Sequence, residues 1–210
     1  MEYNSWSNDL PALEHFCKIS DEEWHRFHTD LPIDALLRAA ELISTARQKG
    51  GRLHFSGIGK ASYVAAYCAS LFSSTGTPSY VLHGTEAIHG SCGQLFRQDI
   101  VVLISNSGKT EELLRTAAAV HAIGCQTVAV TSSFESPLAN GASLTLPALV
   151  REEGGPLGRA PRMSVIAQLY VLMALSVLLQ SHVGQTPEQY LRCHPGGTLG
   201  KSGMDKKPPV

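Results

Sequence analysis

Cysteine and net charge are both scarce in this sequence, and each scarcity excludes a class of protein. The five cysteines are an odd number without a Cys-x-x-Cys pair, so we expect free thiols rather than a disulfide framework. The formal net charge is −1 and the Lys and Arg residues are scattered, which excludes the basic surface of a nucleic-acid-binding protein. The first ten residues lack the basic and apolar regions of a secretory signal. We therefore expect a cytoplasmic protein that has no nucleic-acid partner.

Long apolar runs are also missing, apart from one between Met163 and Leu179. That run is short for a membrane span and contains three polar residues, Ser164, Gln168 and Ser176. We therefore expect a buried core helix and no membrane contact. Hydrophobic residues make up 43% of the 210 residues, which is enough for one sizeable domain.

Apolar segments alternate with helical patterns from residue 32 onwards. We expect strands at residues 52–57, 78–84, 99–106, 125–132 and 142–148, with helical segments between them. This alternation predicts an α/β fold with three layers, in which helices cover both faces of a doubly wound, five-stranded parallel sheet. We place the domain at residues 32–203. A helical extension at 1–31 precedes it, and a tail at 204–210 follows it.

A buried strand ends abruptly at a polar cluster in the stretch ISNSGKTEEL. The cluster comprises Ser105, Asn106, Ser107, Lys109 and Thr110 around one glycine, and a helical pattern follows at once. Hydroxyls and backbone N–H groups at a helix start suit an anion, most plausibly a phosphate. Taken alone, the cluster fits a polar turn with an N-cap equally well.

The turn SGIGK, residues 56–60, follows the first strand and also opens a helix. Gly57 and Gly59 permit close approach of a ligand or another segment, and Lys60 supplies a cation. The pattern has neither the dinucleotide-binding spacing nor that of a P-loop. Taken alone, it favours a plain strand-to-helix turn.

Three other motifs contain ionisable residues of uncertain purpose. His83, Glu86 and His89 do not have the spacing of a common zinc site, so a polar loop lining a pocket is the better interpretation. The stretch REEGGPLGRAPR fits a solvated charged loop. A helix C-cap explains the glycines of CHPGGTLGK but leaves His194 unexplained.

Taken together, the motifs resemble one family. GIGKAS, SSTGTPSYVLHGTEAIHG, DIVVLISNSGKTEEL, GGPLGRAP and HPGGTLGK occur in the order of the sugar isomerase (SIS) domain of arabinose-5-phosphate isomerases. The resemblance extends from about Pro32 to Lys201. It implies interconversion of an aldose and a ketose 5-phosphate, in a tetramer with sites between subunits. Because the family's usual CBS domains would begin near residue 205, we expect a form without them.

The resemblance also implies an active site, whose five positions here are Lys60, His89, Glu112, Glu153 and His194. Isomerisation needs a base that moves a proton between C1 and C2 through an enediol, and groups that open the sugar ring and stabilise an oxyanion. We expect Glu153 to be the base and His194 to act in ring opening. Lys60 and His89 would stabilise charge, and Glu112 would orient the sugar or share proton transfer.

We expect the two Gly- and Ser-rich turns and one arginine to bind the substrate or its phosphate. The predicted residues are Ser56, Gly57, Gly59, Ser105, Asn106, Ser107, Lys109, Thr110 and Arg162. We expect neither a metal nor a cofactor.

The sequence departs from the family pattern at several positions. Ala61, Ser91, Lys109 and Met173 replace the family's usual residues, and APRMSVI replaces a run of Thr and Ser hydroxyls. Fewer hydroxyls and an added guanidinium, that of Arg162, predict an altered substrate, with either a different stereochemistry or an additional anionic group that Arg162 could bind. The alternatives are therefore an isomerase of a different phosphosugar, such as a hexulose 6-phosphate, and a non-catalytic sugar-phosphate sensor. The retained acid–base residues favour an enzyme.

Overall fold

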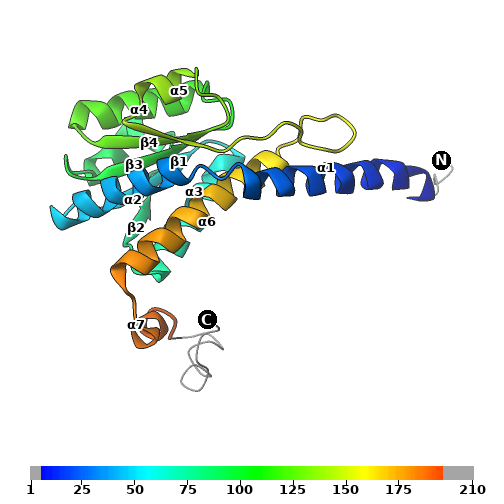
Figure 1. Ribbon diagram of the computed structural model, residues 1–210. Coiled ribbons are helices and arrows are strands. Elements are labelled where there is room, and N and C mark those ends of the chain that lie inside the picture. Colours follow the sequence, from blue (N-terminus) through cyan, green and yellow to red (C-terminus); the bar gives the residue numbers. More distant parts are fainter. Residues whose placement is uncertain (1–5, 196–210) are drawn as a thin grey trace.

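The computed structural model describes residues 6–195. It contains one five-stranded sheet in which all strands are parallel and the strand order is β2-β1-β3-β4-β5 (Figure 1). The strands are β1 (Leu53–Gly57), β2 (Ser79–Val81), β3 (Ile100–Ile104), β4 (Gln126–Thr131) and β5 (Leu144–Pro147). The α/β fold class and the parallel sheet predicted from the sequence are confirmed.

Helices cover both faces of this sheet. One face carries α2 (Ile33–Gln48), α3 (Lys60–Ser74) and α6 (Met163–Val183), and the other carries α4 (Glu111–Ile123) and α5 (Pro137–Gly141). The remaining helices are α1 (Leu10–Thr29), α7 (Pro187–Arg192) and the 3₁₀ helices η1 (Trp6–Asp9), η2 (Glu86–His89) and η3 (Ser91–Gln94). The connections between the parallel strands are therefore crossovers of the βαβ kind.

The alternation of side chains along β3 divides the core in two. Ile100, Val102 and Ile104 pack with α2, α3 and α6, while Val101 and Leu103 pack with α4 and α5. All five are fully buried, as expected for a strand covered on both faces.

Helix α6 is the apolar segment that we expected to be a core helix. Its length and composition would allow it to cross a membrane, but its side chains are placed as in a core helix. Leu172, Leu175 and Leu179 are buried in the cluster formed with α2, α3 and the sheet. Burial of this stripe against the sheet accounts for the apolar residues on that face of α6, whereas Val177 of the same helix is exposed.

Helix α1 projects from the domain, and its amino end lies far from the sheet (Figure 1). Its last turns return to the domain, where Phe27 joins the core cluster. The boundary that we predicted between an extension and a domain at residue 32 stays a prediction. The predicted tail at 204–210 and the glycines of HPGG, Gly196 and Gly197, lie outside the described residues.

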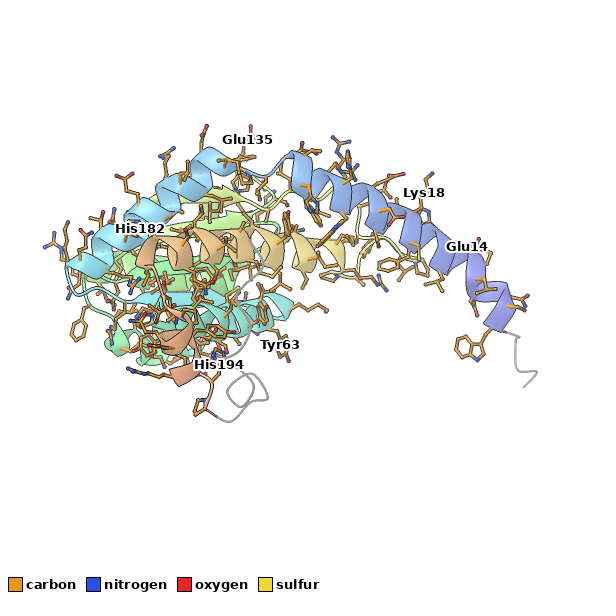
Figure 2. The ribbon with its side chains drawn as sticks, turned by 60° about the horizontal axis from the view of Figure 1, so that its bottom comes forward. Glu14, Lys18, Tyr63, Glu135, His182 and His194 are labelled. Carbon is orange, nitrogen blue, oxygen red and sulfur yellow. The ribbon has the colours of Figure 1, made fainter. Side chains whose placement is uncertain are left out.

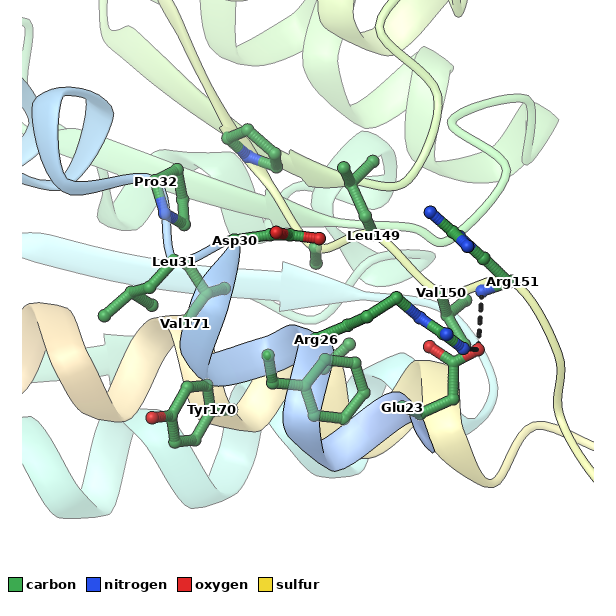
Figure 3. A pocket seen from close by; sticks show the side chains of 14 residues that line it. Glu23, Arg26, Asp30, Leu31, Pro32, Leu149, Val150, Arg151, Tyr170 and Val171 are labelled. Carbon is green, nitrogen blue, oxygen red and sulfur yellow. Dashed lines mark hydrogen bonds and ion pairs between the residues drawn. The ribbon is translucent and has the colours of Figure 1, made fainter. Parts of the chain in front are cut away.

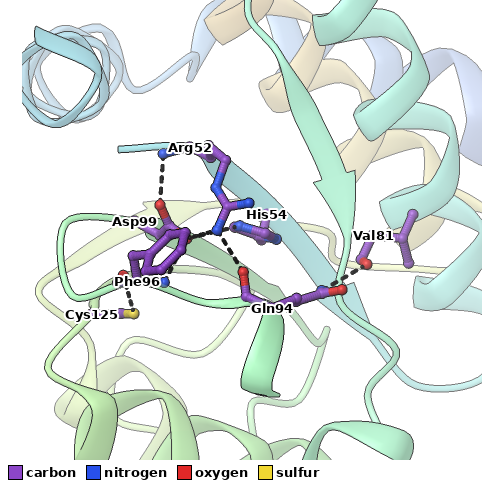
Figure 4. A network of polar contacts seen from close by, with 7 residues as sticks. All are labelled: Arg52, His54, Val81, Gln94, Phe96, Asp99 and Cys125. Carbon is purple, nitrogen blue, oxygen red and sulfur yellow. Dashed lines mark hydrogen bonds and ion pairs between the residues drawn. The ribbon is translucent and has the colours of Figure 1, made fainter. Parts of the chain in front are cut away.

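A polar network closes the edge of the sheet where the strands begin (Figure 4). Asp99 is fully buried. It accepts hydrogen bonds from the backbone and guanidinium N–H groups of Arg52, at 2.8 and 2.9 Å, and from the backbone N–H of Phe96. His54 Nε2 lies 3.2 Å from Asp99 Oδ2. The guanidinium of Arg52 also covers the ring of Phe96 at 4.7 Å, so the network ties β1 to the segment before β3.

Candidate functional site

A cavity of about 270 Å³ opens at the carboxyl ends of β1 and β3. These two strands lie where the strand order reverses direction, which is the place where open α/β sheets bind ligands. Its lining comes from the turn after β1, the loop after β3 and the first turns of α6: Ile58, Lys60, Ala61, Ile104, Ser105, Asn106, Ser107, Thr110, Pro161, Ser164, Val165 and Gln168.

The loop after β3 brings three hydroxyls to the cavity. Ser105 Oγ lies 3.2 Å from Thr110 Oγ1 and accepts the backbone N–H of Gly108 at 3.1 Å. Ser107 Oγ accepts the N–H of Lys109. The loop leads directly into α4, whose first residue is Glu111, so its hydroxyls stand at the positive end of a helix dipole. This arrangement suits a phosphate dianion.

Asn106 is held in this loop through its main chain. Its carbonyl oxygen accepts hydrogen bonds from the N–H and hydroxyl of Ser132 and from the hydroxyl of Thr131, at 2.8 to 3.0 Å. Its side-chain Oδ1 is buried and has no partner within the described protein. The loop is therefore fixed to the end of β4 while one polar atom stays unpaired beside the cavity.

The turn after β1 places one cation at the same cavity. Lys60 is the first residue of α3 and its side chain is exposed. Gly59 has a φ of +60°, and a Cβ at Gly57 would lie 2.7 Å from the backbone of Ala61. Both glycines shape the turn and neither lines the cavity, nor does the fully buried Ser56. Of the residues predicted in this turn, only Lys60 faces the cavity.

Glu153 does not line the cavity but contacts the start of α6, which forms one of its walls. Its Oε2 accepts the backbone N–H groups of Arg162 at 2.7 Å and Ser164 at 3.1 Å, so it caps the amino end of α6. Ser164 in turn lines the cavity. The carboxylate therefore holds a fixed position against the element that forms one side of the site.

This chain resembles both proteins of known activity and proteins of known structure. The sequence matches the SIS domain over residues 47–178. The chain belongs to the SIS-domain family. It is 36% identical over 168 residues to arabinose 5-phosphate isomerase KdsD of Pseudomonas aeruginosa, and 37% identical over 151 residues to KdsD of Escherichia coli K12. These alignments cover 80% and 72% of this chain, but 51% and 46% of the relatives, so the chain spans about half of their length.

Solved structures show the same SIS fold. The E. coli CFT073 protein c3406, solved in complex with arabinose 5-phosphate, superposes with a TM-score of 0.80 and is 33% identical to this chain. The match covers 91% of this chain and all of that one. The sugar isomerase domain of the RpiR transcription factor from Sphaerobacter thermophilus has a TM-score of 0.68 at 21% identity, which shows the shared fold alone.

Other predicted site residues of this SIS domain lie apart from the cavity. His89 ends η2 and Glu112 lies in the first turn of α4, and both are exposed. Lys109 is exposed and does not line the cavity. The guanidinium of Arg162 donates to the carbonyl of Gly154 at 3.2 Å, within the loop that contains Glu153.

His194 does not line the cavity either. It follows α7, beyond the carboxyl end of α6 (Figure 2). Glu153 instead contacts the amino end of the same helix. The 21 residues of α6 separate these ends by about 32 Å at 1.5 Å per residue. The ring of His194 packs on Tyr190, and Nδ1 lies 2.8 Å from the Tyr190 carbonyl oxygen.

The loop with His83 and Glu86 forms a hydrogen-bonded turn. His83 Nδ1 lies 3.1 Å from the hydroxyl of Thr85 and accepts the N–H of Glu86 at 3.3 Å. Within residues 6–195, no three His, Cys, Asp or Glu side chains are placed to hold a metal ion.

Gln168 is a cavity residue that the sequence analysis did not select. It is 3% exposed and its Oε1 is buried without a hydrogen-bond partner among the described residues. Its position four residues after Ser164 on an apolar helix places both on one face, a signal present in the sequence. A substrate hydroxyl is the kind of donor that this atom lacks.

Proposed function

We propose that this SIS-domain protein is an aldose–ketose isomerase that interconverts D-ribulose 5-phosphate and D-arabinose 5-phosphate through an enediol. The observation that carries the proposal is the cavity at the switch point of the sheet. It combines the hydroxyls of Ser105, Ser107 and Thr110 with the ammonium of Lys60. The names of the KdsD relatives and the arabinose 5-phosphate complex of c3406 support the same substrate class.

The proposed roles follow from the chemistry of the reaction. The Ser105–Thr110 loop binds the phosphate and directs the sugar toward α6. Glu153 exchanges a proton between C1 and C2, and Lys60 stabilises the developing oxyanion. His89 assists Lys60, Glu112 orients the sugar, and His194 acts in ring opening. These steps need neither a metal nor a cofactor.

A homotetramer with shared sites is part of the proposal. The cavity lies at the amino end of α6 and His194 follows α7, beyond the carboxyl end of α6, which supports the supply of His194 by a second copy. Exposed apolar side chains support such assembly, among them Trp6, Leu13, Tyr63 and Val177. The five cysteines are all free, which fits the cytoplasmic location that we propose.

A different phosphosugar is the second candidate, because the α6 side of the cavity is poor in hydroxyls. Pro161 and Val165 line that side together with Ser164 and Gln168. Such a wall would select another arrangement of substrate hydroxyls.

The test is exchange of solvent deuterium into a panel of pentose and hexose phosphates, followed by NMR. We expect exchange and interconversion of arabinose 5-phosphate and ribulose 5-phosphate, both lost in Glu153→Gln. The glutamine keeps an oxygen that can accept the N–H groups of Arg162 and Ser164, so α6 stays capped. Activity on another phosphosugar alone would establish the second candidate, and binding without any exchange would establish a sensor.

A further inference from the structure

The projecting helix α1 contacts the loop that carries Glu153. This loop connects β5 to α6 and runs beside α1 (Figure 1). Residues of α1, including Glu23 and Arg26, and of the loop, including Arg151, border one cavity of about 220 Å³ (Figure 3). Residues 151–154 of the loop lie within residues 47–178, the region that matches the SIS domain, whereas α1 ends at Thr29 and lies outside that region.

One buried carboxylate of α1 binds the main chain of this loop. Glu23 is 1% exposed, and its Oε1 accepts the backbone N–H groups of Arg151 and Glu152, each at 3.0 Å. The same oxygen accepts the guanidinium of Arg26 at 2.5 Å, and this hydrogen bond raises the pKa of Arg26. The two amides immediately precede Glu153, so Glu23 fixes the backbone on its amino side.

A second contact fixes the backbone on the carboxyl side of Glu153. Gly154 has a φ of +65°, and a Cβ there would lie 2.8 Å from the ring of Phe16. Ile19 lies 3.7 Å from the same point. The loop therefore rests directly on α1 at residue 154, and residues 151, 152 and 154 are all held by one helix.

The side chain of Glu153 links this loop to α6. Its backbone is held by α1, and its carboxylate accepts the N–H groups of Arg162 and Ser164 at the start of α6. A shift of the loop by about 1 Å would displace the carboxylate relative to a substrate bound at Ser105–Thr110. Displacements of that size reduce the rate on the order of 100-fold.

We propose that Glu23 is a positioning residue, which acts through Glu153 and does not touch the substrate. This inference rests on the proposed isomerase function. It makes α1 part of the catalytic framework, although the helix lies outside the region that matches the family. Arg26 pairs with the buried carboxyl group of Glu23, whose oxygen also accepts the loop amides.

The test compares Glu23→Ala and Glu23→Gln with the control Glu22→Gln, an exposed neighbour on α1. We expect Glu23→Ala to lose about 100-fold in kcat with little change in KM, since the phosphate loop is untouched. The acid limb of its pH–rate profile should also move, because the loop that holds Glu153 is released. Glu23→Gln retains an acceptor oxygen and should recover most of kcat, and Glu22→Gln should match wild type.

Folding and function are separated within the same series. Circular dichroism at the assay temperature establishes whether each variant is folded. If Glu23→Ala does not fold, the kinetics of Glu23→Gln test the proposal. If Glu23→Ala is folded and keeps the wild-type kcat and pH profile, the positioning role is overturned. The role is also overturned if kcat of Glu23→Gln falls by about 100-fold, the loss expected for Glu23→Ala. Wild-type protein that turns over no sugar phosphate overturns the proposed function itself.

Discussion

At the scale of single residues, the unpaired polar atoms are the most informative. Gln168 Oε1, Asn106 Oδ1 and Ser56 Oγ are buried without a hydrogen-bond partner among residues 6–195. A buried acceptor without a donor costs about 1–3 kcal/mol, so such atoms persist where a ligand pairs with them. Gln168 and Asn106 line the proposed substrate cavity, while Ser56 lies in β1 and does not.

Gln168→Met tests this interpretation. Methionine has a similar length and no amide, so we expect kcat/KM to fall about 10-fold or more while the free energy of unfolding stays the same or rises. Steady-state kinetics and urea unfolding measure the two quantities. Gln180→Met, farther along α6 and outside the cavity, is the matched control. A fall in stability without a fall in kcat/KM would show that Gln168 supports the fold alone.

His54 provides a prediction on the pH dependence of stability. Burial lowers its pKa despite the nearby Asp99, so the folded protein holds a neutral imidazole where the unfolded chain binds a proton. Burial alone would raise the pKa of Asp99, but hydrogen bonds from Phe96 and Arg52 outweigh it and lower that pKa. Both groups contribute stability that is lost on acidification, His54 below about pH 6.5 and Asp99 below about pH 4.

The variant His54→Gln isolates the first of these losses. Glutamine can still donate a hydrogen bond to Asp99 Oδ2 but does not titrate, so the free energy of unfolding should depend less on pH between about 6.5 and 5. Urea unfolding at several pH values gives the slope. The exposed His15→Gln should leave it unchanged. A wild-type slope in His54→Gln would contradict the assignment.

At the scale of elements, the loop between β3 and α4 depends on one glycine. Gly108 has a φ of +62°, and a Cβ there would lie 2.1 Å from Ser136 Oγ. Ser136 cannot move aside easily, because it is fully buried and its hydroxyl caps α5. The loop that presents Ser105 and Ser107 to the cavity can therefore form only without a side chain at residue 108.

We expect Gly108→Ala to lose on the order of 2 kcal/mol of stability and most of the affinity for sugar phosphates. Unfolding curves and calorimetric titration measure these effects. Gly93→Ala is the matched control, since no heavy atom lies within 4 Å of its Cβ position. Unchanged phosphate affinity in Gly108→Ala would mean that this loop is not the phosphate site.

At the scale of the whole molecule, the separation of His194 from Glu153 predicts that activity depends on assembly. The two variants Lys60→Met and His194→Ala should each be inactive alone. When they are mixed and reassembled, about a quarter of the shared sites combine wild-type Lys60 with wild-type His194, so about a quarter of the activity should return. Turnover of arabinose 5-phosphate by the mixture is the measurement. Assembled mixtures without activity would show that His194 does not serve a neighbouring subunit.

Local patterns in the sequence determined most of the fold. The apolar runs at 99–106 and 125–132 and the helical pattern of 163–179 correspond to β3, β4 and α6, because burial on both faces needs continuous apolar segments. The loop hydroxyls of Ser105, Ser107 and Thr110 were recognisable as a phosphate site only together with the other family motifs, since the cluster alone fits a polar turn equally well.

Only the tertiary structure decided which of those residues meet. Glu153 caps α6 through contacts across nine and eleven residues, and Glu23 reaches Arg151 across 128 residues. No local pattern encodes such distances, because they depend on how α1, α6 and the loop between β5 and α6 pack together. The separation of His194 from the cavity has the same origin: the sequence predicts each helix, but packing alone sets where its ends lie.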